Sequence, residues 1–316
     1  MNLNPLSAMY GAVVGARNAF YERRWLRSRS LQAPVISVGN LSAGGSGKTP
    51  FVILLGELLK SRGIRFDVLS RGYGRATRGV LLVDPGGLPR DFGDEPLLIA
   101  RRLRVPVIVG EDRYEAGCFA ESRFGAQVHL LDDGFQHRGL ARDFDIVLVT
   151  PEDARDRLLP AGRLREPLHS LQRADAVVLA SGASAESFPL AGKTAWRVRR
   201  GIVIDNLPMR PVVFCGIARP QNFLLQLRTA GVDPAAEAFF RDHHAYTEKD
   251  VSDLLALQQR SEAGGFVTTE KDAVNLGGYL VALQPLAVVP VKMELADADN
   301  AVDTMLRVIE ERRGRS

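Results

Sequence analysis

Cysteine is scarce in this chain. Only two cysteines, Cys118 and Cys215, occur among 316 residues, and neither belongs to a CxxC or CxxH pair. A disulfide framework and a zinc site are therefore excluded, and we expect both thiols to be buried in a reducing compartment. The chain also has no low-complexity tract and no internal repeat, and its 46% hydrophobic and 25% charged content is that of a folded soluble protein. Its length predicts about two domains, at roughly 150 residues each.

The sequence lacks an apolar run long enough to cross a bilayer. The stretch before Arg17 is short and mixed, and its positive charges follow the apolar part, the reverse of a signal peptide. Residues 1–30 carry five arginines and one glutamate, a surplus equal to the formal net charge of the whole chain, +4. Apolar residues recur there near helical spacing, at Leu6, Met9, Tyr10, Val13, Phe20 and Tyr21. Residues 1–30 thus predict an amphipathic helix on an anionic membrane surface; the alternative is a helix packed on the domain with solvated arginines.

A glycine-rich turn between a strand pattern and a helix pattern is the most informative local feature. Residues 35–38 predict a strand, the turn ends in Gly47, Lys48 and Thr49, and 51–59 are rich in Leu, Val and Ile. Such a turn favours phosphate, because its amides and the helix end are positive, lysine neutralises the β- and γ-phosphates and threonine binds Mg²⁺. A phosphate loop is favoured over an ordinary Gly/Ser turn, although Ser42 stands where GxxxxGK[ST] has glycine. The predicted nucleotide contacts are Ser42, Ala43, Gly44, Gly45, Ser46, Gly47, Lys48 and Thr49.

Strand and helix patterns alternate along residues 31–190. Short β-branched or leucine-rich runs predict strands at 66–69, 105–109, 128–131, 145–149 and 176–179. Helices are expected at 95–104 and 113–123. The fold class is therefore α/β, a phosphate-loop NTPase-like parallel sheet flanked by helices. Ligands of such sheets bind at the carboxyl ends of the strands, so the residues that follow each strand are candidates for the site.

Three of these strand ends or loops carry polar groups. Asp132 and Asp133 end one strand, where a phosphate-loop enzyme holds Mg²⁺. Because neighbouring strand residues point to opposite sides, we expect the two not to share one ligand position; an acidic turn is the alternative. The loop SRGYGR, from Ser70, predicts contacts to an acceptor phosphate, or else a solvent loop. Asp94, in GDEP, is either a helix N-cap or a general base.

A ribbon and a smaller α/β lobe are predicted after residue 190. Alternation around a central glycine at 195–204 predicts a two-stranded ribbon, and we take 191–210 as the hinge and 211–316 as the smaller lobe. Strands are expected there at 211–217, 266–268 and 286–290, and helices at 221–229, 248–260 and 301–312. Two lobes joined in this way can close over ATP and exclude water.

The smaller lobe contributes two further polar clusters. His243 and His244 precede a helix whose start is marked by Thr247 and Asp250, a variant of the capping box. Taken alone, this pair indicates a surface loop. Residues 268–272, TTEKD, end another predicted strand and either position the first lobe or neutralise the site.

Together these motifs resemble the tetraacyldisaccharide 4′-kinase family, the inner-membrane lipid A kinases of Gram-negative bacteria. The resemblance covers nearly the whole chain and rests on VGNLSAGGSGKTP, SRGYGR, GDEP, EDR, LDDGFQHR, GRLREP, DHHAY and TTEKDAV. In this family a serine or threonine at the Ser42 position is ordinary. The resemblance implies ATP- and Mg²⁺-dependent phosphorylation of the 4′-hydroxyl of tetraacyldisaccharide 1-phosphate, which gives lipid IVA.

The resemblance also implies residue roles. Asp94 would be the base, assisted by His243, although the adjacent His244 leaves the functional imidazole open. Metal binding and catalytic support would fall to Asp132, Asp133 and Glu166, with Lys48 and Thr49 on the nucleotide. The implied acceptor contacts are Arg71, Tyr73, Arg75, Arg113, Gln136, His137 and Arg165.

The implied location is peripheral, on the cytoplasmic face of the bacterial inner membrane, where the acylated lipid substrate resides. No motif indicates a nucleic acid or an obligate protein partner. A phosphate-loop GTPase or metal-insertion chaperone should carry NKxD, which this sequence lacks, so adenine is favoured over guanine. A non-catalytic, ATP-binding membrane switch is the other alternative.

Overall fold

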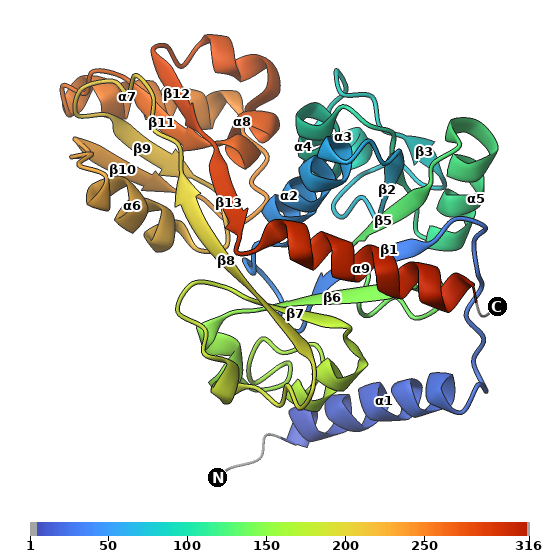
Figure 1. Cartoon of the computed structure of the whole chain (residues 1–316). Coiled ribbons are helices and arrows are strands. Elements are labelled where there is room, and N and C mark those ends of the chain that lie inside the picture. The colour runs from blue at the N-terminus through green and yellow to red at the C-terminus, as the bar shows by residue number, and fades with distance from the viewer. Residues whose placement is uncertain (1–4, 315–316) are drawn as a thin grey trace.

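A computed structural model of the chain describes residues 5–314. The predicted residues 1–4 of the N-terminal segment and 315–316 of the smaller lobe lie outside this range. Two sheets are present within it, one of nine strands and one of four, and each forms the centre of a lobe (Figure 1). The predicted α/β class with a second, smaller lobe is confirmed.

The larger sheet is parallel except at its two ends. Its spatial order is β13-β8-β7-β6-β1-β5-β2-β4-β3, with antiparallel pairing only of β13 with β8 and of β3 with β4 among the described residues. In chain order its strands are β1 (Val35–Asn40), β2 (Phe66–Ser70), β3 (Leu81–Leu82), β4 (Val107–Val109), β5 (Val128–Asp132), β6 (Phe144–Val149), β7 (Ala176–Leu179), β8 (Thr194–Ile202) and β13 (Val291–Leu295). The central strands are buried along their whole length, which explains their continuous apolar runs.

Helices cover both faces of this sheet. They are α2 (Lys48–Ser61), α3 (Pro89–Phe92), α4 (Asp94–Leu103), α5 (Arg113–Phe124) and the last helix, α9 (Ala298–Arg313). Short 3₁₀ turns lie at Pro151–Arg155, Leu168–Arg173 and Ala185–Ser187. The helix before the first strand, α1 (Pro5–Glu22), lies along the loops at one end of the lobe (Figure 1).

The smaller sheet has the order β10-β9-β11-β12 and is parallel. Its strands are β9 (Val212–Cys215), β10 (Ala236–Phe239), β11 (Phe266–Thr269) and β12 (Leu286–Val289), and its helices are α6 (Pro220–Thr229), α7 (Glu248–Arg260) and α8 (Glu270–Leu276), followed by a 3₁₀ turn at Gly277–Val281. Thr247 and Asp250 form the predicted capping box at the start of α7. Strand β10 and helix α8 were not predicted.

The connection between the lobes differs from the two-stranded hinge expected at 191–210. Thr194–Ile202 forms one continuous strand, β8, rather than a hairpin around Gly201. Its antiparallel partner is β13, from the far end of the chain, with Val291 opposite Ile202. The alternation at 195–204 is therefore that of one half-exposed strand, and the ribbon is completed by a segment that sequence pattern could not pair with it.

The last helix also differs from the expected lobe bounds of 211–316. Ala301, Val302, Met305 and Ile309 of α9 are buried in the same core cluster as the strands of the larger sheet. The chain thus returns through β13 to pack α9 on the larger lobe (Figure 1). Residues that follow strands of both sheets line one cavity.

Candidate active site

A cavity of about 790 Å³ lies between the lobes, and the predicted phosphate loop lines it. Gly44, Gly45 and Gly47 all have positive φ, at 78°, 49° and 85°. Helix α2 begins directly after them at Lys48. The positive φ values turn the backbone into a concave loop that ends at a helix N-terminus, an arrangement that binds anions.

Ala218 and Arg219 of the smaller lobe pack closely against this loop. A Cβ placed on Gly45 would lie 3.3 Å from the Cβ of Ala218 and 3.2 Å from the Cγ of Arg219. Arg219 itself forms an ion pair with Glu152 of the larger lobe, at 3.1 Å. Glycine is therefore needed at position 45 both for its backbone angle and for the close approach of the second lobe.

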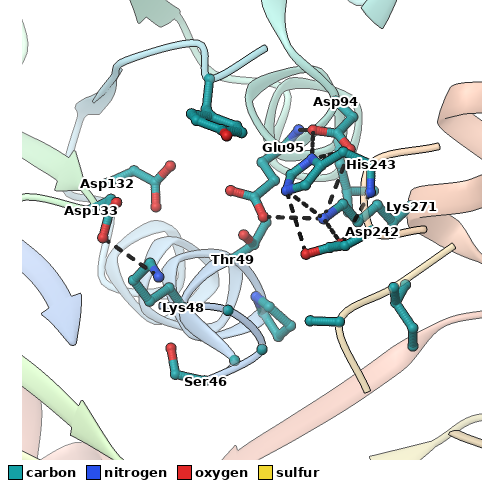
Figure 2. A pocket seen from close by; sticks show the side chains of 18 of the residues that line it. Ser46, Lys48, Thr49, Asp94, Glu95, Asp132, Asp133, Asp242, His243 and Lys271 are labelled. Atoms are coloured by element: carbon teal, nitrogen blue, oxygen red, sulfur yellow. Dashed lines mark hydrogen bonds and ion pairs between the residues drawn. The ribbon is translucent and has the colours of Figure 1, made fainter. Parts of the chain in front are cut away.

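Lys48 reaches from the loop towards Asp133 (Figure 2). Its Nζ donates to Oδ1 of Asn40 at 3.1 Å and lies 3.5 Å from Oδ1 of Asp133, which also accepts from Arg165. Burial favours the neutral form of Asp133, but the two cations outweigh it and lower the pKa of this carboxyl. Asp133 thus pairs with Lys48, the side chain that is expected to bind the nucleotide phosphates.

Asp132 is the other carboxylate at the end of β5. It is 2% exposed; its Oδ2 accepts from Ser70, while its Oδ1 has no hydrogen-bond partner among the described residues. Burial, with Glu95 and Asp133 nearby, raises the pKa of Asp132 to about 7. An orphaned buried oxygen on a carboxylate that resists ionisation is a site that a cation would stabilise.

The strand alternation from which we expected Asp132 and Asp133 not to share one ligand position does not extend through Asp133, although the two carboxylates have different partners. The strand ends at Asp132, and Asp133 has a φ of 50°, so the alternation of an extended strand does not continue through it. Both carboxylates line the same cavity (Figure 2).

Asp94 and His243 meet across the cleft, although 149 residues separate them in the sequence. Nδ1 of His243 lies 2.8 Å from Oδ2 and 3.0 Å from Oδ1 of Asp94 (Figure 2). The amide of Glu95 and the side chain of Asn275 also donate to this carboxylate. Burial acts to raise the pKa of Asp94, but His243, Lys271 and Asn275 outweigh it and the pKa is lowered. Asp94 is therefore an ionised, buried carboxylate at neutral pH.

The structure distinguishes the two adjacent histidines. His243 lines the cavity and has a φ of 58°, a left-handed conformation that is uncommon outside glycine and clusters at functional sites. His244 instead stacks on Phe240 and pairs through Nε2 with Asp250 at 3.1 Å. The imidazole that reaches Asp94 is thus that of His243.

Most predicted acceptor residues line the same cavity. The lining includes Arg71, Tyr73, Arg113, Gln136, His137 and Arg165. Burial, together with Arg113, lowers the pKa of His137 to about 4, so its ring is neutral at physiological pH. The cavity therefore combines several guanidinium groups with neutral hydrogen-bonding side chains.

Three predicted site residues lie away from the cavity lining. Ser42 is fully buried and bridges to Leu164 beneath the loop. The side chain of Arg75 turns to Glu111 and to the carbonyl of Gly79. Glu166 accepts two hydrogen bonds from Arg173 and one from Asn18. Glu166 thus has structural partners in place of the expected catalytic contact, because Arg173 neutralises its charge.

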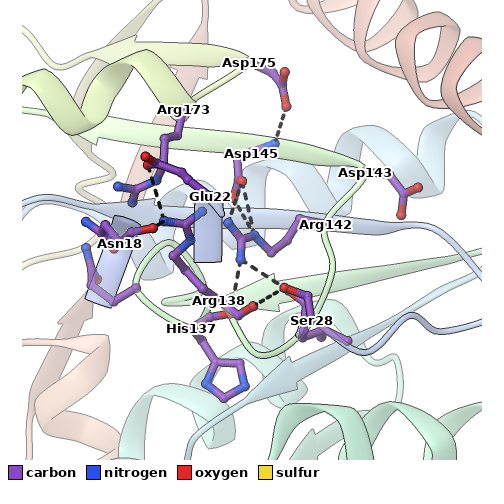
Figure 3. Close-up of polar contacts among 12 residues, drawn as sticks. Asn18, Glu22, Ser28, His137, Arg138, Arg142, Asp143, Asp145, Arg173 and Asp175 are labelled. Atoms are coloured by element: carbon purple, nitrogen blue, oxygen red, sulfur yellow. Dashed lines mark hydrogen bonds and ion pairs between the residues drawn. The ribbon is translucent and has the colours of Figure 1, made fainter. Parts of the chain in front are cut away.

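Helix α1 docks on the larger lobe through polar groups. Ser7 donates to the carbonyl of Leu158, Tyr10 to that of Arg165, and Asn18 to the carboxylate of Glu166. Farther along, the guanidinium of Arg138 donates to the carbonyl of Asn18, and the backbone carbonyl of Arg138 accepts from the hydroxyl of Ser28 (Figure 3). The inward face of this helix is therefore its hydrogen-bonding face.

The outward face of α1 is apolar. Met9 is 63% exposed, Val13 64% and Phe20 40%, and Trp25, just beyond the helix, is 66% exposed. Positions 9, 13 and 20 fall on one helical stripe, and the arginines at 23, 24 and 27 follow it. None of the helices within residues 5–314 is long and apolar enough to cross a bilayer.

Charged residues that line the cavity but were given no site role from sequence include Arg17, Glu95 and Arg219. Arg219 follows the carboxyl end of β9, where the strand-end rule could have found it, and Lys271 belongs to the 268–272 cluster predicted at a strand end. Arg17 comes from α1 and donates to the carbonyl of Gln136 at 2.8 Å. No local pattern distinguishes it from the other arginines of that segment.

Comparisons with known proteins agree with this geometry. The family model described as tetraacyldisaccharide-1-P 4′-kinase matches residues 1–310. A tetraacyldisaccharide 4′-kinase from Koribacter versatilis is 50% identical, over 99% of this chain and all of its own length. One from Aquifex aeolicus is 40% identical, over 88% of this chain and 90% of its own. A crystal structure of LpxK from Aquifex aeolicus in complex with ATP superposes with a TM-score of 0.80 at 35% identity, covering 96% of this chain and 98% of that one.

Proposed function

Since the chain belongs to the tetraacyldisaccharide-1-P 4′-kinase family, we propose that it transfers the γ-phosphoryl group of ATP to the 4′-hydroxyl of tetraacyldisaccharide 1-phosphate. The product would be lipid IVA, in lipid A biosynthesis. The observation that carries this proposal is the meeting of the phosphate loop with the Asp94–His243 pair in one cavity. The first element binds a nucleoside triphosphate, and the second can accept a proton from an alcohol.

ATP would bind with its phosphates in the glycine loop. Lys48 would exchange its contact with Asp133 for the β- and γ-phosphates, which carry more charge. Asp132, with its unpartnered Oδ1, and the hydroxyl of Thr49 fit a Mg²⁺ ion held chiefly by phosphates. Bound there, Mg²⁺ would neutralise charge that develops on the transferred group. Among the described residues, no group of three or more acidic, histidine or cysteine side chains is arranged to hold a metal ion.

Asp94 would act as general base. Its carboxylate is ionised, faces the cavity and is held by hydrogen bonds from His243, Asn275 and the Glu95 amide. In a loose transition state the hydroxyl proton leaves late, so the base needs correct position more than high basicity. Closure of the lobes on the two ligands would keep water from the γ-phosphate.

The acceptor would lie beside the arginines of the larger lobe. The planar guanidinium groups of Arg71, Arg113 and Arg165 line the cavity and can each donate two parallel hydrogen bonds to an anionic sugar phosphate. Tyr73, Gln136 and the neutral ring of His137 would then contact sugar hydroxyls.

The lipid substrate explains an outward apolar face on α1. Removing an acyl chain from a bilayer costs about 0.8 kcal/mol for each methylene exposed, so an enzyme for a four-chain lipid must work at the membrane surface. Met9, Val13, Phe20 and Trp25 would enter the interface, and the arginines after the helix would face anionic headgroups. We accordingly propose peripheral attachment to the cytoplasmic face of the inner membrane.

The proposed function is tested by incubating the protein with ATP labelled at the γ-phosphate and a crude lipid fraction. Label should enter a disaccharide lipid and depend on Mg²⁺. Release of free phosphate alone would favour a nucleotide hydrolase, and binding of ATP without turnover would favour a membrane switch.

The pH dependence of the reaction should change when His243 is replaced. His243 opposes the effect of burial on Asp94 and keeps the pKa of that carboxyl low. In His243→Ala burial remains and this opposition is reduced, so the pKa of Asp94 rises and the acidic limb of the kcat/KM profile moves to higher pH. His244→Ala, which removes a histidine paired with Asp250 instead, is the matched control. An acidic limb at the same pH in both variants would contradict the role of His243.

A further inference from the structure

A lysine beside the Asp94–His243 pair has no part in the reaction as described so far. Lys271 lies in the first turn of α8, which Thr269 caps by accepting from the amide of Asp272. Its Nζ lies 3.1 Å from Nε2 of His243 and 3.0 Å from Oδ1 of Asp242 (Figure 2). The side chain is only 17% exposed, so water competes little for these contacts.

The contact between Lys271 and His243 determines which ring nitrogen of a neutral His243 carries the proton. Burial favours the neutral amine, but Glu95, Asp94 and Asp242 outweigh it and raise the pKa of Lys271. Lys271 is therefore an ammonium, which can only donate. Nε2 of His243 must then accept, and the single ring proton sits on Nδ1, 2.8 Å from Oδ2 of Asp94.

We propose that Lys271 is a positioning residue that holds His243 in the tautomer whose Nδ1–H faces Asp94. Because Lys271 also covers Nε2, the imidazole has no free nitrogen to take the proton of the acceptor hydroxyl. Asp94 is then the group left to receive it. This inference rests on the proposed function, in which Asp94 is the base, and it adds the residue that assigns the two roles.

The charged surroundings of His243 support this role. The hydrogen bond to Asp94 of α4, together with Asp242 of the same loop as His243, outweighs burial and Lys271 of α8, so the pKa of His243 is raised. The ring of Tyr73, from the loop after β2, lies 5.5 Å away between centroids. Two cations 3.1 Å apart repel each other, so Lys271 is the charged group in this described set that opposes protonation of Nε2. Asn275 of the same helix also donates to Asp94, so α8 orients both members of the pair.

Histidine ¹⁵N NMR of the full-length protein tests the proposal, with the His243 signals assigned by their loss in His243→Gln. In the wild type, Nδ1 should be protonated and Nε2 unprotonated above the titration midpoint of His243. In Lys271→Met the titration midpoint of His243 should move to higher pH, and kcat should fall about tenfold or more while KM for ATP changes little. Lys271→Arg keeps a charged donor, so its His243 titration midpoint and its kcat should both lie near the wild-type values. Lys249→Met, at a lysine that is 81% exposed on α7, is the matched control.

A third variant at position 271 separates hydrogen bonding from charge. Lys271→Gln can still donate to Nε2 but carries no charge, so it should keep the tautomer while the midpoint of His243 rises. An identical His243 titration in the wild type and in all three variants at position 271 would overturn the proposal, as would a neutral wild-type ring that carries its proton on Nε2. These spectra need no lipid acceptor, so a failure of phosphoryl transfer would count against the proposed function alone.

Discussion

Replacing Asp94 with asparagine is expected to lower kcat by about 10²- to 10⁴-fold, the range that general-base catalysis supplies, with little change in ATP affinity. The amide cannot take up the proton of the acceptor hydroxyl, whereas the glycine loop and Lys48 stay as they are. Asparagine is a better replacement than alanine, because its amide oxygen can still accept the hydrogen bond of His243, whereas alanine would leave a buried donor unpaired at a cost of about 1–3 kcal/mol.

The measurement pairs turnover on lipid in mixed micelles with the dissociation constant for ATP. Asp299→Asn is the matched control, since that carboxylate is 92% exposed and forms only a surface ion pair with Arg62. Near-normal turnover in Asp94→Asn would remove Asp94 as the base. A loss of ATP affinity equal to the loss of turnover would instead assign it to nucleotide binding.

Replacing Met9, Val13 and Trp25 together with glutamine should release the protein from vesicles. Each of these side chains is more than 60% exposed, and burying one in an apolar phase is worth about 1.5–3 kcal/mol. The three together account for several kcal/mol, so the membrane-bound fraction should fall by about two orders of magnitude or more. Activity on lipid in vesicles should fall with it, while ATP affinity should not change.

The matched control replaces three apolar residues elsewhere that are also more than 60% exposed, Met209, Leu225 and Val281, with glutamine. Vesicle flotation measures partition, and the same assay in detergent micelles shows whether the site itself is intact. Unchanged partition of the α1 variant would mean that this helix is only a packed surface element. An equal loss in the control variant would mean that exposed apolar area in general, rather than α1, holds the protein to lipid.

Much of the larger lobe could be predicted because its signals are local. The strands around the phosphate loop are buried on both faces, so their sequences are short apolar runs. The loop is recognised by its glycines, which adopt positive φ. The strand-end rule then located Asp132, Asp133 and Arg71 without further information. The pairing of Asp94 with His243 was implied by family resemblance, since no local pattern relates two residues in different lobes.

The missed features depend on long-range contacts. Strand β8 finds its partner in β13, and a half-exposed strand with a central glycine cannot be told from a hairpin without that partner. The roles of Arg75 and Glu166 depended on which opposite charge the fold brought near, Glu111 in one case and Arg173 in the other. For the same reason, sequence could show that α1 is amphipathic but not that its polar face would pack inward.

The central claim is that ATP held by the glycine loop delivers its γ-phosphoryl group to a lipid alcohol beside Asp94. Rapid quenching of the purified protein with γ-labelled ATP, Mg²⁺ and tetraacyldisaccharide 1-phosphate in micelles tests it most directly. The account predicts label in the lipid at the 4′-position, and none when the lipid lacks the 4′-hydroxyl. Label released only as inorganic phosphate, at a rate indifferent to the lipid, would contradict it.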